Sequence, residues 1–558
     1  MILFIGEISI NGLAISSAPP DESIKNGVWS TISSDFSEIH ICDFSSQKNN
    51  FLEMGPLSIA VSGLPVIQQA GVEKSKQISY IANALTSENH KALSNANGVF
   101  CGFILNRGTN VVHLFTDYLG LRQIYIYRTN ERFVFSNAKW LITSYINRNN
   151  LSLDLDSITE IGVLGYPLAN RTQFKEIQLL PPGCVMKITS LGMVQVEQYY
   201  DLTSIQRTPI GEEEALEKLY LIWKIAVQER CSDTKKCFGF LSGGMDSRLL
   251  VHTLKTLDID VFTANFAPLG TLDRVFGEMS AKSMQVHHFQ HPSGTMLSDV
   301  LTETVEAWKA DDQCNNFFND TPFVWSGDGG SVGMGHVYLT DEMSYLASQS
   351  EFEECARIWC CENNRNIPLR LFRDGKIKDK LELRISDLMQ DYGHTNPERA
   401  VYYYLMLNDQ RRHLDKHYEI FHRRGFDLQL PFFDKRLIEF ISSLPTEMFN
   451  YHRIYDKLFR KISGSLTSTP WQTYPKHIPC LLKVPDDLTY QWSDLFYSKR
   501  EKRIKAKEDA IYCLEKSIWG KLPRGVFDRT YLFFGAIATI GNISDYSYCR
   551  HYIEPCFE

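Results

Sequence analysis

The sequence has no excess of positive charge and no long hydrophobic run. Its 558 residues include 58 Lys and Arg against 66 Asp and Glu, a formal net charge of -8 at pH 7. Without a dense Lys/Arg block, neither a nucleic acid nor an anionic membrane is expected as a main partner. The apolar run Tyr531 to Ile540 is too short to span a bilayer and predicts a buried helix. The first residues, MILFIGEISINGL, lack a basic segment, so neither a secretory signal nor a membrane anchor is expected.

Cysteine is present, but not in the pattern of a metal site or a disulfide framework. The 13 cysteines are spread from Cys42 to Cys556, an odd number without the paired short spacings of either kind of site. We therefore expect buried thiols in a reducing compartment, the cytoplasm. Repeats and low-complexity tracts are also absent, and a content of 44% hydrophobic and 22% charged residues is typical of a chain that folds throughout.

Two stretches of different pattern follow one another along the chain, whose length exceeds what one hydrophobic core usually serves. Residues 94–198 contain short β-rich runs separated by polar or glycine-containing turns, which predicts antiparallel strands. From residue 212 an amphipathic helix is followed by strand, helix and strand, which predicts a parallel sheet with crossover helices. We place the boundary near Thr208 to Gly211. The expected fold class is therefore α+β for residues 1–208 and α/β, with many helices, for residues 209–558.

The segment FGFLSGGMDSRLL, residues 238–250, has the composition of a phosphate-binding loop. A β-run ends at Leu241 and a helix starts near Asp246. The small residues between them let several backbone N–H groups face one anion, and the helix N-terminus adds the positive end of its dipole. Phosphates would repel a carboxylate at Asp246 unless a cation intervened, which predicts bound Mg²⁺. The alternative is a plain glycine-rich turn with an N-cap.

The full string S-G-G-x-D-S after a strand resembles the ATP-pyrophosphatase loop of the asparagine synthetase family. Further stretches resemble the same family: DYLGLRQIYIY with FVFSNAKWL, TQFKEIQLLPPGCVMKI, FTANF with Asp273, WSGDGG, and LPFFDKRLIEFISSLP. The resemblance implies an amino-terminal glutaminase-like β-sandwich of the Ntn type and a carboxyl-terminal domain of the adenine-nucleotide α-hydrolase type. It also implies ATP and Mg²⁺ as cofactors. The residues expected to bind them are Leu241, Ser242, Gly243, Gly244, Asp246, Ser247 and Gly327, with Asp246 and Asp328 as metal ligands.

The amino terminus departs from the family pattern. Glutamine-hydrolysing members carry a cysteine directly after the initiator methionine, whereas this chain has Ile2. Without a thiol no glutamyl thioester can form. The glutamine-contacting pattern N-G-E-I-Y-N is absent as well, so residues 1–208 are expected to keep the fold without the glutaminase reaction.

The loop SGDGGSV, residues 326–332, contains the second departure from the family pattern. Where family members place an aspartate as a metal ligand, this chain has Ser331, which brings no charge. Asp328 matches the family position that contributes a general-base element. We expect Asp328 to act either as a general base or as a metal ligand. The alternative is a solvated loop aspartate without a catalytic role.

Two lysines complete the expected catalytic set. Expulsion of pyrophosphate develops negative charge on the leaving group, which cations stabilise. Lys457 in YDKLFRK and Lys476 in WQTYPKH occupy segments similar to those of the family's two synthetase lysines. The alternative interpretation is that both are ordinary surface lysines.

Loss of the glutaminase beside an intact synthetase cleft is the pattern of β-lactam synthetases and lasso-peptide cyclases. TPWQTYPKHIPC and WSGDGGSVGMGH look more like cyclase-type members. This resemblance implies an ATP-dependent ligase that closes a macrolactam on a peptide, as in antibiotic biosynthesis, with a precursor-processing protease as a further partner. The 33 Phe and 26 Tyr suit a wide peptide cleft, but aromatic residues also fill cores. An ammonia-dependent asparagine synthetase and a non-catalytic nucleotide-binding protein, the latter motivated by Ser331, remain alternatives.

Overall fold

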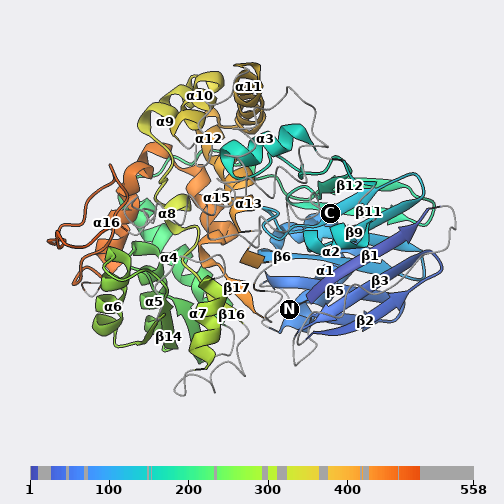
Figure 1. Cartoon of the computed structure of the whole chain (residues 1–558), viewed down its shortest axis with the longest axis horizontal. Coiled ribbons are helices and arrows are strands. Elements are labelled where there is room, and N and C mark those ends of the chain that lie inside the picture. Colours follow the sequence, from blue (N-terminus) through green and yellow to red (C-terminus); the bar gives the residue numbers. More distant parts are fainter. Residues whose placement is uncertain are drawn as a thin grey trace, which may run out of the picture.

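The computed structural model separates a β-sandwich half from a half built on a parallel sheet (Figure 1). The helix expected at residues 531–540, and all of the second expected domain beyond residue 490, lie outside the described residues. The structure describes residues 2–10, 27–44, 50–67, 73–146, 150–152, 154–231, 235–291, 300–310, 323–362, 375–414, 417–418, 421, 426–462, 464 and 466–490.

The sandwich half consists of two sheets in which every described strand pairing is antiparallel. Its strands are β1 (Ile2–Ser9), β2 (Val28–Ser33), β3 (Ser37–Asp43), β4 (Phe51–Met54), β5 (Leu57–Val66), β6 (Asn97–Asn106), β7 (Val111–Thr116), β8 (Tyr125–Arg128), β9 (Arg132–Ser136), β10 (Ile177–Leu179), β11 (Cys184–Thr189) and β12 (Val194–Gln198). One sheet has the order β10-β8-β9-β1-β3-β2 and the other β12-β11-β7-β6-β5-β4. Its helices are α1 (Lys74–Thr86), η2 (His90–Asn95), α2 (Lys139–Tyr145), α3 (Leu155–Leu164) and η4 (Leu202–Ser204).

Strand β1 is buried on both faces, which shows how the layers of this half are stacked. Ile2 and Phe4 pack between the two sheets, whereas Leu3 and Ile5 belong to the cluster under α2. Because successive side chains of a strand point to opposite faces, the unbroken apolar run 2–5 needs protein on both sides. Helices α1 and η2 cover the outer face of the other sheet in the same way. The half is therefore a four-layered sandwich with helices outside and two sheets inside, which confirms the first part of the predicted fold class.

The second half contains a sheet whose described strands all pair in parallel, in the order β15-β14-β13-β16-β17. These strands are β13 (Lys236–Phe240), β14 (Asp260–Asn265), β15 (His287–Gln290), β16 (Phe323–Trp325) and β17 (Asp427–Gln429). The chain builds outward from β13 on one side and then returns to add β16 and β17 on the other. The order thus reverses between β13 and β16, and open α/β sheets bind ligands beyond the carboxyl ends of the strands at such a point.

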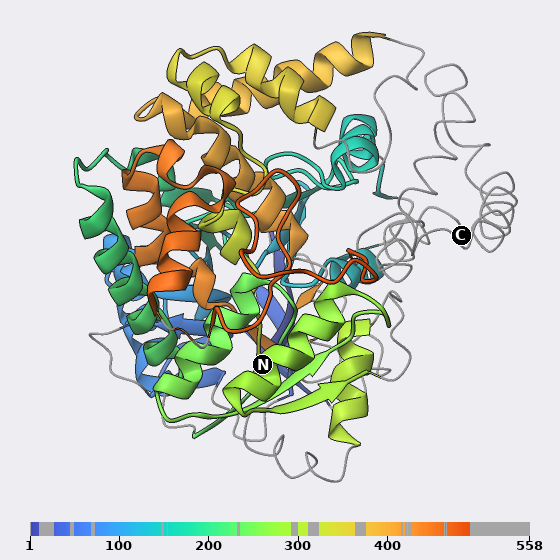
Figure 2. The same cartoon turned by 90° about the vertical axis from the view of Figure 1, so that its left-hand side faces the viewer.

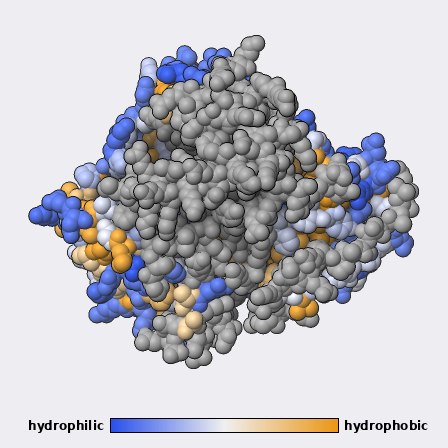
Figure 3. Space-filling view, in the orientation of Figure 1, coloured by the Kyte–Doolittle hydropathy of each residue, from blue (hydrophilic) through white to orange (hydrophobic). Residues whose placement is uncertain are grey.

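Helices make up the rest of this half, which confirms the second part of the predicted fold class. They are α4 (Glu212–Cys231), α5 (Met245–Thr256), α6 (Leu272–Met284), α7 (Val300–Lys309), α8 (Gly330–Gly333), α9 (Asp341–Ser348), α10 (Phe352–Glu362), α11 (Gly375–Tyr392), η6 (Pro397–Arg399), α12 (Ala400–Tyr404), η7 (Leu405–Gln410), α13 (Arg411–His413), η8 (Pro431–Phe433), α15 (Lys435–Ser443), η9 (Thr446–Met448), η10 (Asn450–His452) and α16 (Arg453–Ile462). Among the described residues no helix is both long and apolar enough to cross a bilayer. Hydrophilic side chains line the upper helices and the outer end of the sandwich on the face shown in Figure 3. None of the nine described cysteines forms a disulfide, and seven of them are buried.

A buried carboxylate joins the two halves. Asp434, at the start of α15, accepts hydrogen bonds from Asn97 Nδ2 of β6 and Arg230 Nη1 of α4, both at 2.7 Å. Burial opposes ionisation of Asp434, but Arg230 and Arg436 outweigh it and hold the pKa at about 2. Tyr118 adds a hydrogen bond from its hydroxyl to the Phe433 carbonyl. The two halves are thus fixed to each other through charged and polar contacts as well as through a shared apolar cluster.

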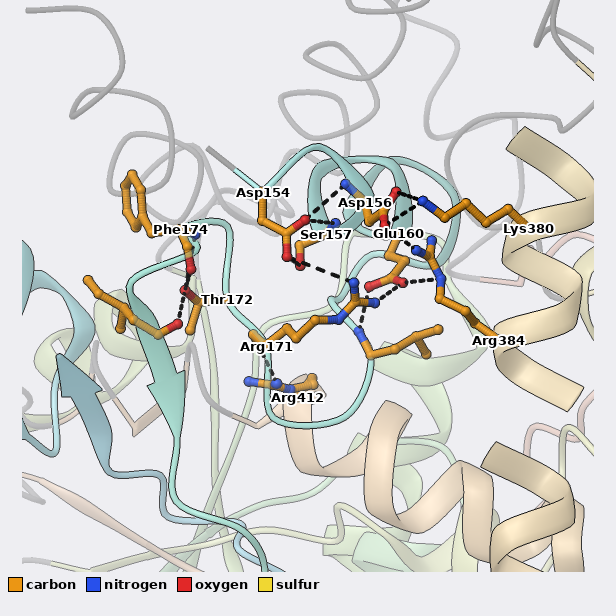
Figure 4. A network of polar contacts seen from close by, with 12 residues as sticks. Asp154, Asp156, Ser157, Glu160, Arg171, Thr172, Phe174, Lys380, Arg384 and Arg412 are labelled. Carbon is orange, nitrogen blue, oxygen red and sulfur yellow. Dashed lines mark hydrogen bonds and ion pairs between the residues drawn. The ribbon is translucent and has the colours of Figure 1, made fainter. Parts of the chain in front are cut away.

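A second charged joint ties α3 to α11 (Figure 4). Glu160 is fully buried and pairs with Arg171 and with Arg384, whose Nε lies 3.1 Å from the carboxylate. Asp156, one turn earlier, pairs with Arg384 at 2.7 Å and Lys380 at 2.8 Å. The sandwich half therefore also holds the long helix of the second half in place.

Candidate active site

The expected phosphate loop lies at the carboxyl end of β13, next to the reversal of strand order. The strand ends at Phe240 and α5 begins at Met245. Gly244, the cap residue of α5, offers no side-chain acceptor, so the first N–H groups of the helix are directed to a ligand or solvent. The hydroxyl of Ser247 accepts from the Ser242 N–H at 2.9 Å, and the hydroxyl of Ser242 accepts from the Gly244 N–H at 3.2 Å. These bonds fold the loop into a compact turn, and Leu241, which precedes it, is buried.

Glycines allow two loops to meet at this point. The loop that follows β16 contains Gly327 and Gly330 and lies against the start of α5. A Cβ at Gly330 would come within 2.5 Å of Asp246 Cγ, and one at Gly327 within 2.7 Å of the Ser247 nitrogen. Contacts this short do not occur between real atoms, so only glycine permits the approach. The two glycine-rich motifs predicted from the sequence therefore form one site.

Two carboxylates line the cavity between these loops. Asp246 accepts from the Tyr455 hydroxyl at 2.8 Å and the Ser331 N–H at 2.9 Å. Asp273 accepts from the Gly243 N–H at 2.9 Å. Burial raises the pKa of each carboxylate to about 6, although these hydrogen bonds oppose the shift. A carboxylate that resists ionisation for want of solvent is stabilised by a cation.

The donor set fits Mg²⁺ bound jointly by protein and phosphate. Among the described residues no group of three or more His, Cys, Asp or Glu side chains is arranged to hold a metal by itself. Mg²⁺ commonly takes only one or two protein carboxylates and completes its shell with phosphate oxygens and water. Asp246 and Asp273 would supply the protein's share. Ser331 lines the same cavity, and its N–H orients the Asp246 carboxylate.

Asp328 lies beside this centre without lining the cavity. Its Oδ2 accepts from the Ser326 hydroxyl at 2.8 Å, and the side chain is half-buried. Burial first and then the charge of Asp328 raise the pKa of Asp246, which places the two carboxylates near each other. The structure places Asp328 near Asp246, and its role as base or ligand stays a prediction.

Neither predicted lysine lines the cavity. Lys457 is exposed on α16 and pairs with Glu212 of α4. Lys476 is also exposed, and its backbone is left-handed with a φ of 68°. Its neighbours Tyr474 and His477 do line the cavity. Lys476 thus lies beside the site and Lys457 outside it, and the catalytic roles of both stay predictions.

The segment 466–478, which holds Lys476 and most of the cyclase-like string TPWQTYPKHIPC, forms a wall of the cavity. Gln472, Tyr474 and His477 line the cavity from this segment, and Gln472 N–H donates to the Gly243 carbonyl at 2.9 Å. Buried Arg248 of α5 donates to three carbonyls at the start of the segment, those of Leu466, Thr469 and Pro470. Figure 2 shows the segment as an orange-red trace, without helix or strand, that crosses the parallel-sheet half. No local motif marks such a wall, because long-range hydrogen bonds set its position.

His452 and Tyr455 were also missed. His452 lines the cavity, and the Tyr455 hydroxyl bonds Asp246. Tyr455 lies in YDKLFRK, the segment from which only Lys457 was predicted, and His452 lies three residues before that segment. His452 ends η10 with a left-handed backbone and Tyr455 lies on α16, so no helical spacing relates the two residues.

Ile2, which stands where glutamine-hydrolysing enzymes of the resembled family carry their cysteine, is part of the hydrophobic core. The Ile2 side chain is fully buried between the sheets, and its carbonyl accepts from Asn137 Nδ2 at 3.0 Å. An apolar side chain held inside the sandwich offers no reactive group.

Comparison with known proteins gives no family. No family model and no curated protein sequence match the chain. Similar solved structures include glutamine phosphoribosylpyrophosphate amidotransferase from B. subtilis, complexed with ADP and GMP, with 11% identity, a TM-score of 0.23 and coverage of 56% of this chain and 88% of that one. Another is the allosteric regulatory enzyme of purine biosynthesis, with 10% identity, a TM-score of 0.22 and coverage of 47% of this chain and 58% of that one. Likeness at this level carries no argument about activity.

Proposed function

We propose that the chain is an ATP-dependent amide-forming ligase. It would transfer the AMP part of ATP to a substrate carboxylate, release pyrophosphate, and pass the activated acyl group to an amine. The observation that carries the proposal is the meeting of two glycine-rich loops at the strand-order reversal, with Asp246 and Asp273 in the cavity between them. A plain N-capped turn would need neither the second loop nor the two enclosed carboxylates.

Each part of the site has a task in this chemistry. The N–H groups at the start of α5 would bind phosphate oxygens, and the helix dipole would favour their charge. Asp246 and Asp273 would hold Mg²⁺, which supplies positive charge to the departing pyrophosphate. Ser242 and Ser247 keep the loop in shape through their paired hydroxyls, 2.9 Å apart.

The amine would not come from glutamine, since Ile2 places an apolar side chain where the nucleophile would stand. It would come from a second substrate or from the same molecule. The sequence resemblance favours macrolactam closure on a peptide, with a processing protease as a further partner in the cytoplasm. An ammonia-dependent asparagine synthetase is the second candidate, which the same cavity and Ile2 both allow.

The experiment is ATP–pyrophosphate exchange with Mg²⁺ and a panel of carboxylates: L-aspartate, L-glutamate and short peptides with one internal Asp or Glu. We expect exchange that depends on the carboxylate and is lost in Asp246→Asn. The matched control is Asp260→Asn, an exposed aspartate at the opposite, amino end of β14. Equal exchange in both variants would remove Asp246 from the chemistry, and ADP as the product would contradict adenylation.

A further inference from the structure

Two histidines that no motif marked face each other at the cavity. The Nδ1 atoms of His452 and His477 are 2.5 Å apart, and both residues line the cavity together with Asp246 and Asp273. Their ring planes meet at 73° with centroids 4.6 Å apart. His452 is only 4% exposed, whereas His477 is half-buried.

The backbone is strained where it delivers His452. Tyr451 and His452 are consecutive non-glycine residues with φ of 60° and 67°, a conformation that side chains other than glycine adopt only where the surroundings hold them in it. The ring is held between Tyr455 and Tyr474, each inclined at 18° to it with centroids 5.8 and 5.9 Å away. A Cβ at Gly335 would lie 2.4 Å from Nε2 of His452, so only glycine fits at position 335. Several independent features thus fix this imidazole in one position.

The contact also fixes how the two Nδ1 atoms share a hydrogen. Two nitrogen atoms at this distance share one hydrogen, because two protons would clash and none would leave two lone pairs in contact. Burial, and then the neighbouring His477, lower the pKa of His452 to about 3. Burial lowers the pKa of His477 as well, although a backbone contact at Val337 opposes it. The pair is therefore uncharged at neutral pH and able to accept a proton.

We propose that His452 and His477 together form the proton acceptor for the attacking amine. This inference rests on the proposed function and concerns only its second half-reaction. As the amine nitrogen forms its bond to the acyl carbon, the carbon–oxygen bond to AMP breaks and AMP leaves with the electron pair. One amine proton moves to an imidazole nitrogen of the pair, which gains one proton and one positive charge.

The proposal can be tested because carboxylate adenylation and amide formation can be measured separately. His452→Asn suits the site because asparagine tolerates a left-handed backbone and its amide can still bond His477, yet it accepts no proton. We expect ATP–pyrophosphate exchange to stay within about twofold of wild type, while amide formation with ammonia falls roughly a hundredfold or more. Hydroxylamine needs little help from a base near neutral pH, so hydroxamate formation should persist. In His477→Ala, added imidazole should restore amide formation, which a merely structural role would not allow.

The control is His394→Asn, an exposed histidine on the loop after α11, which should behave as wild type. His477→Asn serves as the second variant if His452→Asn fails to fold, as judged by circular dichroism. Unchanged amide formation in the folded variant, or an equal loss of exchange and amide formation without imidazole rescue, would overturn the assignment alone. Absence of exchange by the wild-type protein with every carboxylate probe would instead overturn the proposed function.

Discussion

Asp246 and Asp273 are carboxylates enclosed by protein. Asp246 accepts hydrogen bonds from the Tyr455 hydroxyl and the Ser331 N–H, Asp273 accepts one from the Gly243 N–H, and burial still raises the pKa of both. Such an arrangement costs stability and is maintained where a ligand or metal compensates for it. The cost can be measured, because it depends on pH and on one isosteric substitution.

Asp246→Asn should stabilise the metal-free protein while abolishing pyrophosphate exchange. Asparagine can accept from the Ser331 N–H and donate to the Tyr455 oxygen, so both contacts persist without the charge. The pKa of Asp246 is raised from 3.8 to about 6, so the folded state loses stability relative to the unfolded state as pH rises through this range. The variant should therefore gain about 1 to 3 kcal/mol above pH 6 and little near pH 4. Thermal melts at both pH values test this, and a loss of stability above pH 6 would contradict it.

Gly330→Ala tests the contact between the two loops. The added methyl group would lie 2.5 Å from Asp246 Cγ, so the carboxylate must move and exchange should fall by about tenfold or more. Gly333→Ala, in the same short helix, meets its nearest atom at 3.7 Å and should be harmless. The measurement compares the pyrophosphate exchange rates of the two variants. Equal rates would refute the close approach of Gly330 to Asp246.

The sequence predicted the loop residues because a strand, small residues and a helix start lie consecutively in it. It did not predict His452 or Tyr455, because their placement depends on a left-handed turn at Tyr451 and on packing against the distant residue Tyr474. Lys457 was chosen from its segment alone, and the structure places its ammonium group beside Glu212.

At the scale of elements, local sequence patterns predicted the β-rich stretch that holds β6 to β12, the helix α4 and the β13–α5–β14 unit. The wall formed by residues 466–478 has no such pattern and depends on Arg248 and Gly243. The joint between α3 and α11 depends equally on contacts distant in sequence. Charged residues at helical spacing are usually a solvated face, and only the fold shows that Glu160 is buried.

Glu160→Gln should weaken this joint. The substitution leaves Arg171 and Arg384 without the charge that neutralises them, and breaking a buried pair costs about 3 kcal/mol, less where the arginines keep other partners. Asp156→Asn is the control, since its carboxylate is 37% exposed and such pairs contribute about 1 kcal/mol at most. Urea unfolding followed by circular dichroism measures both free energies. A larger effect for Asp156→Asn would show that burial does not set the importance of these pairs.

At the scale of the whole molecule, a sandwich with Ile2 at the start of its first strand is fixed to the half that contains the glycine-rich loop before α5. Asn97, Arg230 and Asp434 join the halves in buried contacts, so the sandwich serves as part of the scaffold. The fold class followed from the sequence because antiparallel and parallel patterns occupy separate stretches. The relative placement of the halves did not, because it depends on side chains far apart in the chain.

Glutamine should not be hydrolysed by this protein. The Ile2 side chain is buried and apolar, and no thioester can form at it. Glutamate release, measured with and without ATP and a carboxylate, should equal that of a heat-inactivated control. Release above that control would mean that another residue supplies a nucleophile.

Adenylation is tested most directly by following oxygen from the carboxylate. A substrate carboxylate that supports exchange is labelled with ¹⁸O and incubated with ATP, Mg²⁺ and ammonia or the peptide's own amine. If the acyl group is activated by attack on the α-phosphate of ATP, AMP gains one labelled oxygen and pyrophosphate gains none. Label in inorganic phosphate, with ADP as product, would contradict the proposed chemistry at Asp246 and Asp273.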